Sequence, residues 1–580
     1  MLKKIILVTL SINTLQAIQI AIPAEELLAK LTLHQKIGQL LIVAAASNFS
    51  QNSEAFASTA IEIPYNTQLD YIENLIKNYE VGGIIFLGHS DPASQIKITQ
   101  RFQSLTRIPL LIAQDSEWGL SMRLNLDSTK VVRYPHNLTL GAIVDQDIIY
   151  KVGYEIGKQC AAIGVHLNLA PVVDINTNQA NPVIHDRAFG DNPERVAQIA
   201  KSFTSGLQAA GILACAKHFP GHGDTSTDSH LDLPIVMHNR ARLDQIELIP
   251  FKALIQLGVA AIMHAHLAIP TIDATGTPAS LSHTIVTTLL QQTLGYQGLS
   301  ITDGLGMRAV NKHYAPGQIE LAAFLAGNDI LLCPLDAPKA IDLIAAEILA
   351  GKISEAELDR RVLKVLRAKQ QVLKQVPIGI YQQHYLTRPS AYALQAQAYR
   401  AAITLVPQAT QPINFNSCTL TNSCIIQIGK LSENLFTQLC KQSACNVLNC
   451  SAKLKTQELD ACLAATQKKD TVIMVIAELN KLAGSNFGVA QNTLNLVAQL
   501  KEMGKSIVLV IFGTPYSVSL FKDIDIIVAY EDITVTQQAV FDVLTGTLQP
   551  SGILPVNLGA LNRYQKNWCA RLGSNQRPTD

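Results

Sequence analysis

The 580-residue chain has few charged residues and almost no net charge. Only 16% of its residues are Asp, Glu, Lys or Arg, whereas about 25% is usual in soluble domains. Its 46 basic and 45 acidic residues leave a formal net charge of +1. Without a basic surplus the chain lacks the attraction that drives binding to nucleic acids or anionic membranes, so we expect neither as a partner. Apolar residues, at 48%, can fill large cores, and the length predicts several domains.

The sequence also lacks an apolar run long enough to cross a bilayer, which takes about 20 residues. The N-terminus has a basic start at Lys3 and Lys4, a short apolar stretch, and small residues at Ala21 and Ala24. This order is typical of a secretory signal peptide, which we place over residues 1–24. We therefore expect an exported protein, periplasmic or extracellular, without a stable membrane span. An ordinary N-terminal helix or an uncleaved anchor remains the alternative.

Zinc-type cysteine spacings are absent as well. Six of the ten cysteines crowd into 45 residues with no histidine among them: Cys418, Cys424, Cys440, Cys445, Cys450 and Cys462. Their spacings are not those of a zinc site. Export would permit one or two disulfides, whose pairing the sequence does not fix. We expect no metal and no cofactor, and the sequence leaves the oligomeric state open.

Residues 25–375 contain eight short apolar runs, each followed by a stretch with helical spacing. The runs are Ile37–Ala45, Gly82–Gly88, Pro109–Asp115, Val165–Ile175, Leu213–Pro220, Ala260–Pro270, Gly298–Gly306 and Gly327–Pro334. Continuous apolar runs are typical of parallel strands that are buried on both faces. Eight β/α units in about 350 residues predict a TIM-type (β/α)8 barrel.

The end of this region is marked by a helix and a linker. The helix is predicted to begin at Ser354, with Glu357 completing a capping box. Pro377 and Gly379 then indicate a linker, which we place over residues 376–394.

A second region, residues 395–560, has four more strand-like runs separated by helical stretches: Cys424–Gly429, Thr471–Ala477, Ser506–Phe512 and Ile524–Ala529. This alternation predicts a smaller, doubly wound α/β sandwich domain. Residues 561–580 have neither helical nor strand periodicity. They resemble the translation of a transfer-RNA gene, and we interpret them as an irregular, artefactual tail.

Polar residues end several of the predicted barrel strands, among them Asp115, Lys217-His218 and Asp303. In a barrel these ends meet at one mouth, where active sites are built. Lys217 opens a loop rich in glycine that leads to Asp228 and His230. A carboxylate two residues from an imidazole can orient the ring and raise its basicity, which predicts an acid/base pair. A metal site or a purely structural loop are the alternatives.

The loop from Lys217 to His230 resembles the signature of glycoside hydrolase family 3, and its Asp228-Ser229-His230 end resembles the β-N-acetylglucosaminidase branch. Further segments resemble the family in the expected order. They are residues 110–119 around Asp115, residues 181–190 around Arg187, residues 300–307 around Asp303, and the C-terminal α/β region. The resemblance covers roughly residues 30–560. One departure is His185, which stands where glycine is common in the family.

The resemblance implies a retaining β-N-acetylhexosaminidase with Asp303 as nucleophile and His230, oriented by Asp228, as acid/base. The residues implied to bind sugar hydroxyls are Asp115, Arg187, Lys217 and His218. The implied substrates carry terminal β-linked N-acetylglucosamine, in peptidoglycan fragments or chitin-derived oligosaccharides. A β-glucosidase or a phosphorylase of the same family, or a non-catalytic sugar-binding relative, are the alternatives. Asp174 remains open between a site residue and a structural partner.

Overall fold

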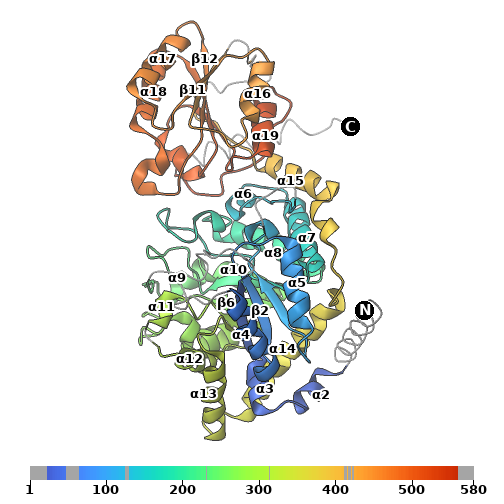
Figure 1. The fold of residues 1–580 in the computed structure, drawn as a ribbon. Helices are drawn as coiled ribbons and strands as arrows, with labels where there is room; N and C mark the ends of the chain where they lie inside the picture. The colour runs from blue at the N-terminus through green and yellow to red at the C-terminus, as the bar shows by residue number, and fades with distance from the viewer. Residues whose placement is uncertain are drawn as a thin grey trace, which may run out of the picture. The chain divides into compact units, whose positions relative to one another are not determined.

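The computed structural model describes residues 22–46, 65–124, 130–229, 232–312, 314–409, 415, 420 and 423–559 (Figure 1). By contact the chain divides into two units. Unit 1 comprises Met1–Tyr134, Tyr150–Ile175 and Val196–Tyr392, and unit 2 comprises Pro135–Ile149, Asn176–Arg195 and Ala393–Asp580. Two short segments from the first part of the sequence therefore belong with the C-terminal part. The predicted leader lies outside the described residues except for 22–24, and the predicted tail lies outside them entirely.

Unit 1 contains eight parallel strands in the order β7-β6-β5-β4-β3-β2-β1-β8. The strands are β1 (Leu41–Ala46), β2 (Gly83–Leu87), β3 (Leu111–Gln114), β4 (Leu167–Asn168), β5 (Leu213–Phe219), β6 (Ala261–His264), β7 (Leu299–Thr302) and β8 (Leu331–Leu332). A parallel bridge between Ile301 and Ile330 joins β7 to the residue preceding β8, which brings the two outer strands together. The predicted TIM-type barrel is confirmed.

Two of the described helices precede the first barrel strand, and the others follow strands around the barrel. The helices are α2 (Ala24–Ala29), α3 (Leu33–Gly38), α4 (Tyr65–Tyr79), α5 (Pro92–Gln103), α7 (Gln146–Ala162), α8 (Pro193–Ala209), α9 (Arg240–Gln245), α10 (Leu248–Leu257), the π-helix η5 (Thr284–Thr293), α11 (Arg308–Asn311), α12 (Gln318–Ala326), α13 (Ala337–Leu349) and α14 (Glu355–Gln375). The short 3-10 turns are η2 (Leu120–Met122), η4 (Ala279–Leu281) and η6 (Gln383–Thr387). Among the described residues, no helix combines the length and the apolar character that crossing a membrane requires.

The barrel strands are shorter in the structure than the predicted runs; for example, Ala260–Pro270 forms only β6 and Gly327–Pro334 forms only β8. The run that begins at Ile37 is helical up to Gly38, because Thr32 caps α3 by accepting a hydrogen bond from the Gln35 amide. The run Val165–Ile175 forms only a two-residue strand, β4. Pro171 interrupts that run, since proline has no amide hydrogen for the strand ladder.

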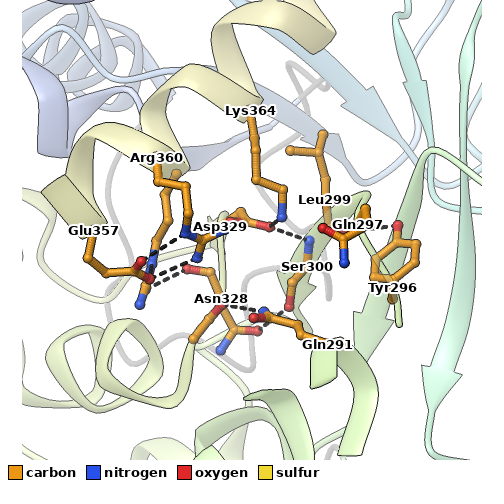
Figure 2. Close-up of polar contacts among 12 residues, drawn as sticks. Gln291, Tyr296, Gln297, Leu299, Ser300, Asn328, Asp329, Glu357, Arg360 and Lys364 are labelled. Carbon is orange, nitrogen blue, oxygen red and sulfur yellow. Dashed lines mark hydrogen bonds and ion pairs between the residues drawn. The ribbon is translucent and has the colours of Figure 1, made fainter. Parts of the chain in front are cut away.

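Helix α14 is attached to the amino ends of β7 and β8 by a buried polar network (Figure 2). Lys364 Nζ lies 2.6 Å from Asp329 Oδ2, which also accepts a hydrogen bond from the Ser300 amide at 2.9 Å. Ser354 caps the helix as predicted, accepting from the Glu357 amide. The predicted capping box is only half formed, because the Glu357 carboxylate instead pairs with Arg360 and its neighbour Arg361.

A second buried cation of α14 lies near the amino end of β1. Lys369 is 2% exposed, and its Nζ donates to Gln39 Oε1 at 2.7 Å. Burial lowers the pKa of Lys369 to about 7, although the nearby Glu80 charge acts in the opposite direction. This part of the barrel therefore holds a lysine that is only partly ionised at neutral pH.

Unit 2 contains a six-stranded sheet in the order β11-β10-β12-β13-β14-β9. The strands are β9 (Thr404–Val406), β10 (Ser423–Ile428), β11 (Val447–Cys450), β12 (Thr471–Ile476), β13 (Ser506–Ile511) and β14 (Asp525–Val528). All pairs are parallel except β14 with β9. The chain runs from β10 outward to β11 and then returns to β12 on the other side of β10, which confirms the doubly wound prediction.

The helices of unit 2 are α6 (Asn137–Gly141), η3 (His185–Arg187), α15 (Pro389–Ala402, which begins in unit 1), α16 (Leu435–Gln442), α17 (Thr456–Thr466), η9 (Ala483–Gly488), α18 (Gln491–Glu502), η10 (Pro515–Leu520) and α19 (Thr534–Leu544). The described cysteines are free thiols in this structure. The Sγ atoms of Cys450 and Cys462 are 3.4 Å apart.

Candidate active site

The carboxyl ends of the barrel strands bring a lysine and an aspartate together. Asp115 directly follows β3, and Lys217 lies near the end of β5. Lys217 Nζ donates to Asp115 Oδ1 at 2.7 Å, and the lysine side chain is only 3% exposed. Burial alone would raise the pKa of Asp115, but the charges of Lys217 and Arg123 outweigh it and hold the pKa well below its ordinary value. Asp115 is therefore a permanent carboxylate.

Two residues that the sequence reading did not single out complete this ion cluster. Glu117 is fully buried, and its Oε1 lies 2.9 Å from Lys217 Nζ. Arg123 Nη2 donates to Asp115 Oδ2 at 2.7 Å. Glu117 stands inside the segment that resembles the family, but Arg123 lies beyond it. Neither residue directly follows a strand, so neither could be predicted from the position of the strand ends.

The open question about Asp174 is answered by its contacts. Asp174 Oδ2 lies 2.7 Å from His218 Nδ1, and its Oδ1 accepts from the backbone amides of His218 and His222 at 3.2 and 2.7 Å. Burial raises the pKa of Asp174, but the adjacent histidines and amides lower it overall. Asp174 is thus a structural partner that orients the His218 ring.

Asp303 follows β7 at the same end of the barrel. Its Oδ1 accepts a hydrogen bond from the Gly304 amide at 2.8 Å. Burial would raise the pKa of this carboxyl group, but the pKa is lowered overall, mainly by the charge of His266 and then by that of His218, with Lys217 contributing less. Asp303 is therefore ionised at neutral pH, as a nucleophile must be.

The loop that follows β5 is anchored by ion pairs up to its middle. Asp224 Oδ2 is 2.8 Å from His238 Nε2 and 3.8 Å from Arg242 Nη2 of α9. Asp228 is partly buried, and its carbonyl accepts from the Asp232 amide at 3.0 Å. His230 lies outside the described residues. The pairing of Asp228 with His230 therefore stays a prediction.

Two of the loop histidines that the alternative metal site would use, His218 and His222, are engaged in other contacts. His222 Nδ1 lies 2.9 Å from Thr225 Oγ1, and the His218 ring bonds to Asp174. Within the described part of the chain, no group of three or more His, Cys, Asp or Glu side chains is arranged to hold a metal ion.

Arg187 belongs to unit 2 and is not grouped with the barrel residues. Its carbonyl accepts from Asn137 Nδ2 at 2.6 Å, and its predicted sugar-binding role stays a prediction. Next to it, His185 is buried with φ +33°, and its ring packs edge-on against Tyr516 with centroids 5.4 Å apart. A left-handed backbone favours glycine, which accounts for the glycine common at this position in the family.

Unit 2 also has a cleft of about 560 Å3 at the carboxyl ends of β10, β11 and β12. Its lining includes Lys430, Lys441 and Glu478 and, among the described residues, none of the predicted site residues. The predicted chemistry thus belongs to the barrel and not to this cleft.

Comparison with known families identifies the family of the chain. The N-terminal domain of glycosyl hydrolase family 3 matches residues 32–368, and the C-terminal domain of the same family matches residues 287–575. The chain belongs to glycosyl hydrolase family 3. The first of these matches contains Asp115, Lys217, His218 and Asp303.

Individual relatives agree with this family. β-Hexosaminidase A of Pseudoalteromonas piscicida is 33% identical over 365 residues, which are 58% of this chain and 61% of that protein. β-Hexosaminidase of Nitrosospira multiformis is 34% identical over 277 residues, 46% of this chain and 77% of that protein. The structure of a glycoside hydrolase family 3 β-N-acetylglucosaminidase from Paenibacillus sp. str. FPU-7 is similar with a TM-score of 0.71 and 29% identity, covering 91% of this chain and 99% of that one. The chain thus spans less than two thirds of the first of these relatives.

Proposed function

We propose that this glycoside hydrolase is a retaining exo-β-N-acetylhexosaminidase that releases terminal β-linked N-acetylglucosamine. The observation that carries the proposal is the ionised Asp303 carboxylate at the barrel mouth, in the same site as the Lys217–Asp115 pair. The names of the hexosaminidase relatives favour an N-acetylated sugar over glucose.

In the first step Asp303 attacks the anomeric carbon, and the glycosidic bond breaks to leave a covalent glycosyl-enzyme. The Gly304 amide occupies Oδ1 of Asp303, which leaves Oδ2 for the attack. In the second step water attacks the same carbon and releases the sugar with its original β configuration.

His230 is proposed to protonate the leaving oxygen and then to activate the water, with Asp228 orienting its ring. A histidine with a pKa near 6.5 can both give and take a proton at neutral pH. An imidazole in this role does not raise the pKa of the nucleophile, as a second carboxylate would through like-charge repulsion.

Sugar hydroxyls are proposed to bind Asp115, Lys217 and His218. Asp115 is an acceptor and Lys217 a donor, and both are fixed by their mutual bond. The His218 ring is held by Asp174. Charged hydrogen bonds of this kind orient a substrate strongly because both partners are already in place.

The sources of the sugar are proposed to be peptidoglycan fragments or, second, chitin-derived oligosaccharides. This assignment depends on the predicted signal peptide, which would place the enzyme outside the cytoplasm, where such glycans occur.

A panel of p-nitrophenyl glycosides tests the activity. We expect release of p-nitrophenol from the β-N-acetylglucosaminide, little from the β-glucoside, and no acceleration by phosphate. Faster cleavage of the β-glucoside would make the enzyme a glucosidase, and a phosphate-dependent rate with a sugar 1-phosphate product would make it a phosphorylase. No turnover of either substrate would favour a sugar-binding relative.

Two variants test the assigned roles. Asp303→Ala is expected to lower kcat by about 10⁴-fold or more, since the covalent step is lost. His230→Ala should slow natural disaccharides more than p-nitrophenyl substrates, because a good leaving group needs little protonation. Equal losses on both substrates would count against His230 as the acid.

A further inference from the structure

We propose that His266 is a positioning residue for Asp303, acting through Gly304. The inference rests on the proposed role of Asp303 as nucleophile. His266 stands two residues after the end of β6 and is fully buried. In the sequence, His266 lies within the predicted strand run Ala260–Pro270.

The contact chain from the ring to the carboxylate has two hydrogen bonds. His266 Nε2 lies 2.9 Å from the Gly304 carbonyl oxygen, which can only accept, so Nε2 carries the hydrogen. The Gly304 amide in turn donates to Asp303 Oδ1 at 2.8 Å. Gly304 is therefore held at both of its polar groups, on one side by the imidazole and on the other by the nucleophile.

Ser280 holds the other side of the ring. Its Oγ lies 2.7 Å from His266 Nδ1. Ser280 is fully buried, its amide donates to the Ala265 carbonyl at 3.1 Å, and its carbonyl accepts from Asn328 Nδ2 at 2.9 Å. The hydroxyl therefore presents a fixed partner to the ring, which keeps Nε2 directed at Gly304.

The charge of His266 also stabilises the ionised form of Asp303. After burial, which raises it, the strongest influence on the pKa of Asp303 is the charge of His266, which lowers it; His218 and Lys217 also contribute. A ring that both fixes Gly304 and stabilises the carboxylate is suited to a nucleophile that must be ionised and correctly oriented in every catalytic cycle.

His264, the last residue of β6, provides a matched control two residues before His266. It is also fully buried, but its Nδ1 lies 3.2 Å from the Ile301 carbonyl and its ring has no described bond to Gly304. Burial lowers its pKa to about 4, so it is neutral at the pH of the assay. Its backbone carbonyl accepts from the Asp303 amide at 2.9 Å, and a side-chain substitution keeps that bond. Replacing the His264 side chain therefore tests the cost of altering a buried histidine of β6 while the hydrogen bonds that join His266, Gly304 and Asp303 stay in place.

The experiment compares His266→Phe, His266→Gln and His264→Gln on p-nitrophenyl β-N-acetylglucosaminide over a range of pH. We expect His266→Phe to lower kcat by about 100-fold with a small change in KM. In the pH profile of kcat/KM for this variant, the acidic limb should move to higher pH, because the pKa of Asp303 rises when the charge of His266 is lost. His266→Gln keeps an amide donor for Gly304 and should recover at least about tenfold of the loss. His264→Gln should keep kcat and the acidic limb close to those of the parent.

The proposal is overturned if His266→Phe, folded by circular dichroism, matches His264→Gln in both kcat and the acidic limb. If His266→Phe does not fold, Ser280→Ala replaces it, since it removes only the hydroxyl that holds Nδ1. A loss of kcat of about fivefold or more with a shifted limb supports the proposal, and parent-like values overturn it. Full activity of Asp303→Ala would instead overturn the proposed function itself, so the two failures are distinguishable.

Discussion

At the carboxyl ends of the barrel strands Lys217 is shared by Asp115 and Glu117, whereas at the amino ends Asp329 is matched by Lys364 from α14. Both sets of charges are buried, and both are ion-paired. The first set lies at the same end of the barrel as the proposed nucleophile, and the charge of Lys217 lowers the pKa of that nucleophile, whereas the second set attaches a helix to the barrel. Burial and charge alone therefore do not distinguish a candidate active site from a structural ion pair in this protein. The end of the barrel at which the charges lie is the better criterion, because active sites in such barrels lie at the carboxyl ends of the strands.

The largest effect is expected at the carboxyl end. Lys217→Met removes the donor shared by the two carboxylates and should raise the pKa of Asp115, since its main counter-charge is lost. We expect kcat/KM on the N-acetylglucosaminide to fall by about a thousandfold, because both sugar orientation and local charge change. Lys201→Met, an exposed lysine of α8, is the control. A loss below about tenfold would contradict the assignment.

At the amino end the expected loss is one of stability. Lys364→Met leaves the fully buried Asp329 without its cation, and breaking such a pair costs about 3 kcal/mol. Urea unfolding followed by Trp118 fluorescence, in a Trp568→Phe background, measures the cost in unit 1. Adding Asp329→Asn should recover part of the loss, and Lys374→Met, exposed on the same helix, should change little. A fall in kcat of the folded enzyme comparable to that of Lys217→Met would erase the distinction between the two ends.

A smaller effect is expected from pH at Lys369, whose folded pKa of about 7 lies below the value of about 10.4 in unfolded chains. Between these values the unfolded state binds more protons, so stability rises with pH, and below pH 7 the full burial penalty remains. From pH 7.5 to 9.5 the free energy of unfolding should rise by about 2 kcal/mol from this group. Lys369→Met should remove that rise, and an unchanged slope in the variant would assign it to other groups.

The smallest effect is expected from Ser354→Ala, which removes the side-chain cap of α14. Loss of such a cap costs about 1 kcal/mol. Ser354→Asp should retain the cap and serves as the control. A cost as large as that of Lys364→Met would show that the helix depends more on its first turn than on the buried network.

Much of the fold could be predicted from the sequence because parallel strands that are buried on both faces consist of continuous apolar runs. Strands that depart from this pattern were missed. β11 (Val447–Cys450) is an edge strand with a polar residue, Asn449, and β9 has only three residues and pairs antiparallel. The length of β4 was overestimated because an apolar run continues beyond the residues that pair.

The positions of Asp115, Lys217 and Asp303 at the carboxyl ends of barrel strands were predictable, because each lies at or next to the end of an apolar run. Glu117 and Arg123 were missed because their partners are fixed only by three-dimensional contacts. The role of Asp174 was open for the same reason, since no sequence pattern states that its carboxylate faces His218. The left-handed backbone of His185 could not be predicted either, because histidine, unlike glycine, does not indicate a positive φ.

The assignment of residues 135–149 and 176–195 to unit 2 has a consequence for synthesis on the ribosome. Gly190 packs so closely against the Pro555 carbonyl that an added Cβ would lie 2.3 Å from that oxygen, yet Pro555 is made 365 residues later. At about 5–20 residues per second this is a delay of roughly 20–70 s. During that interval the early segments have emerged without their partners, so unit 2 completes its packing only after Pro555 has been synthesised.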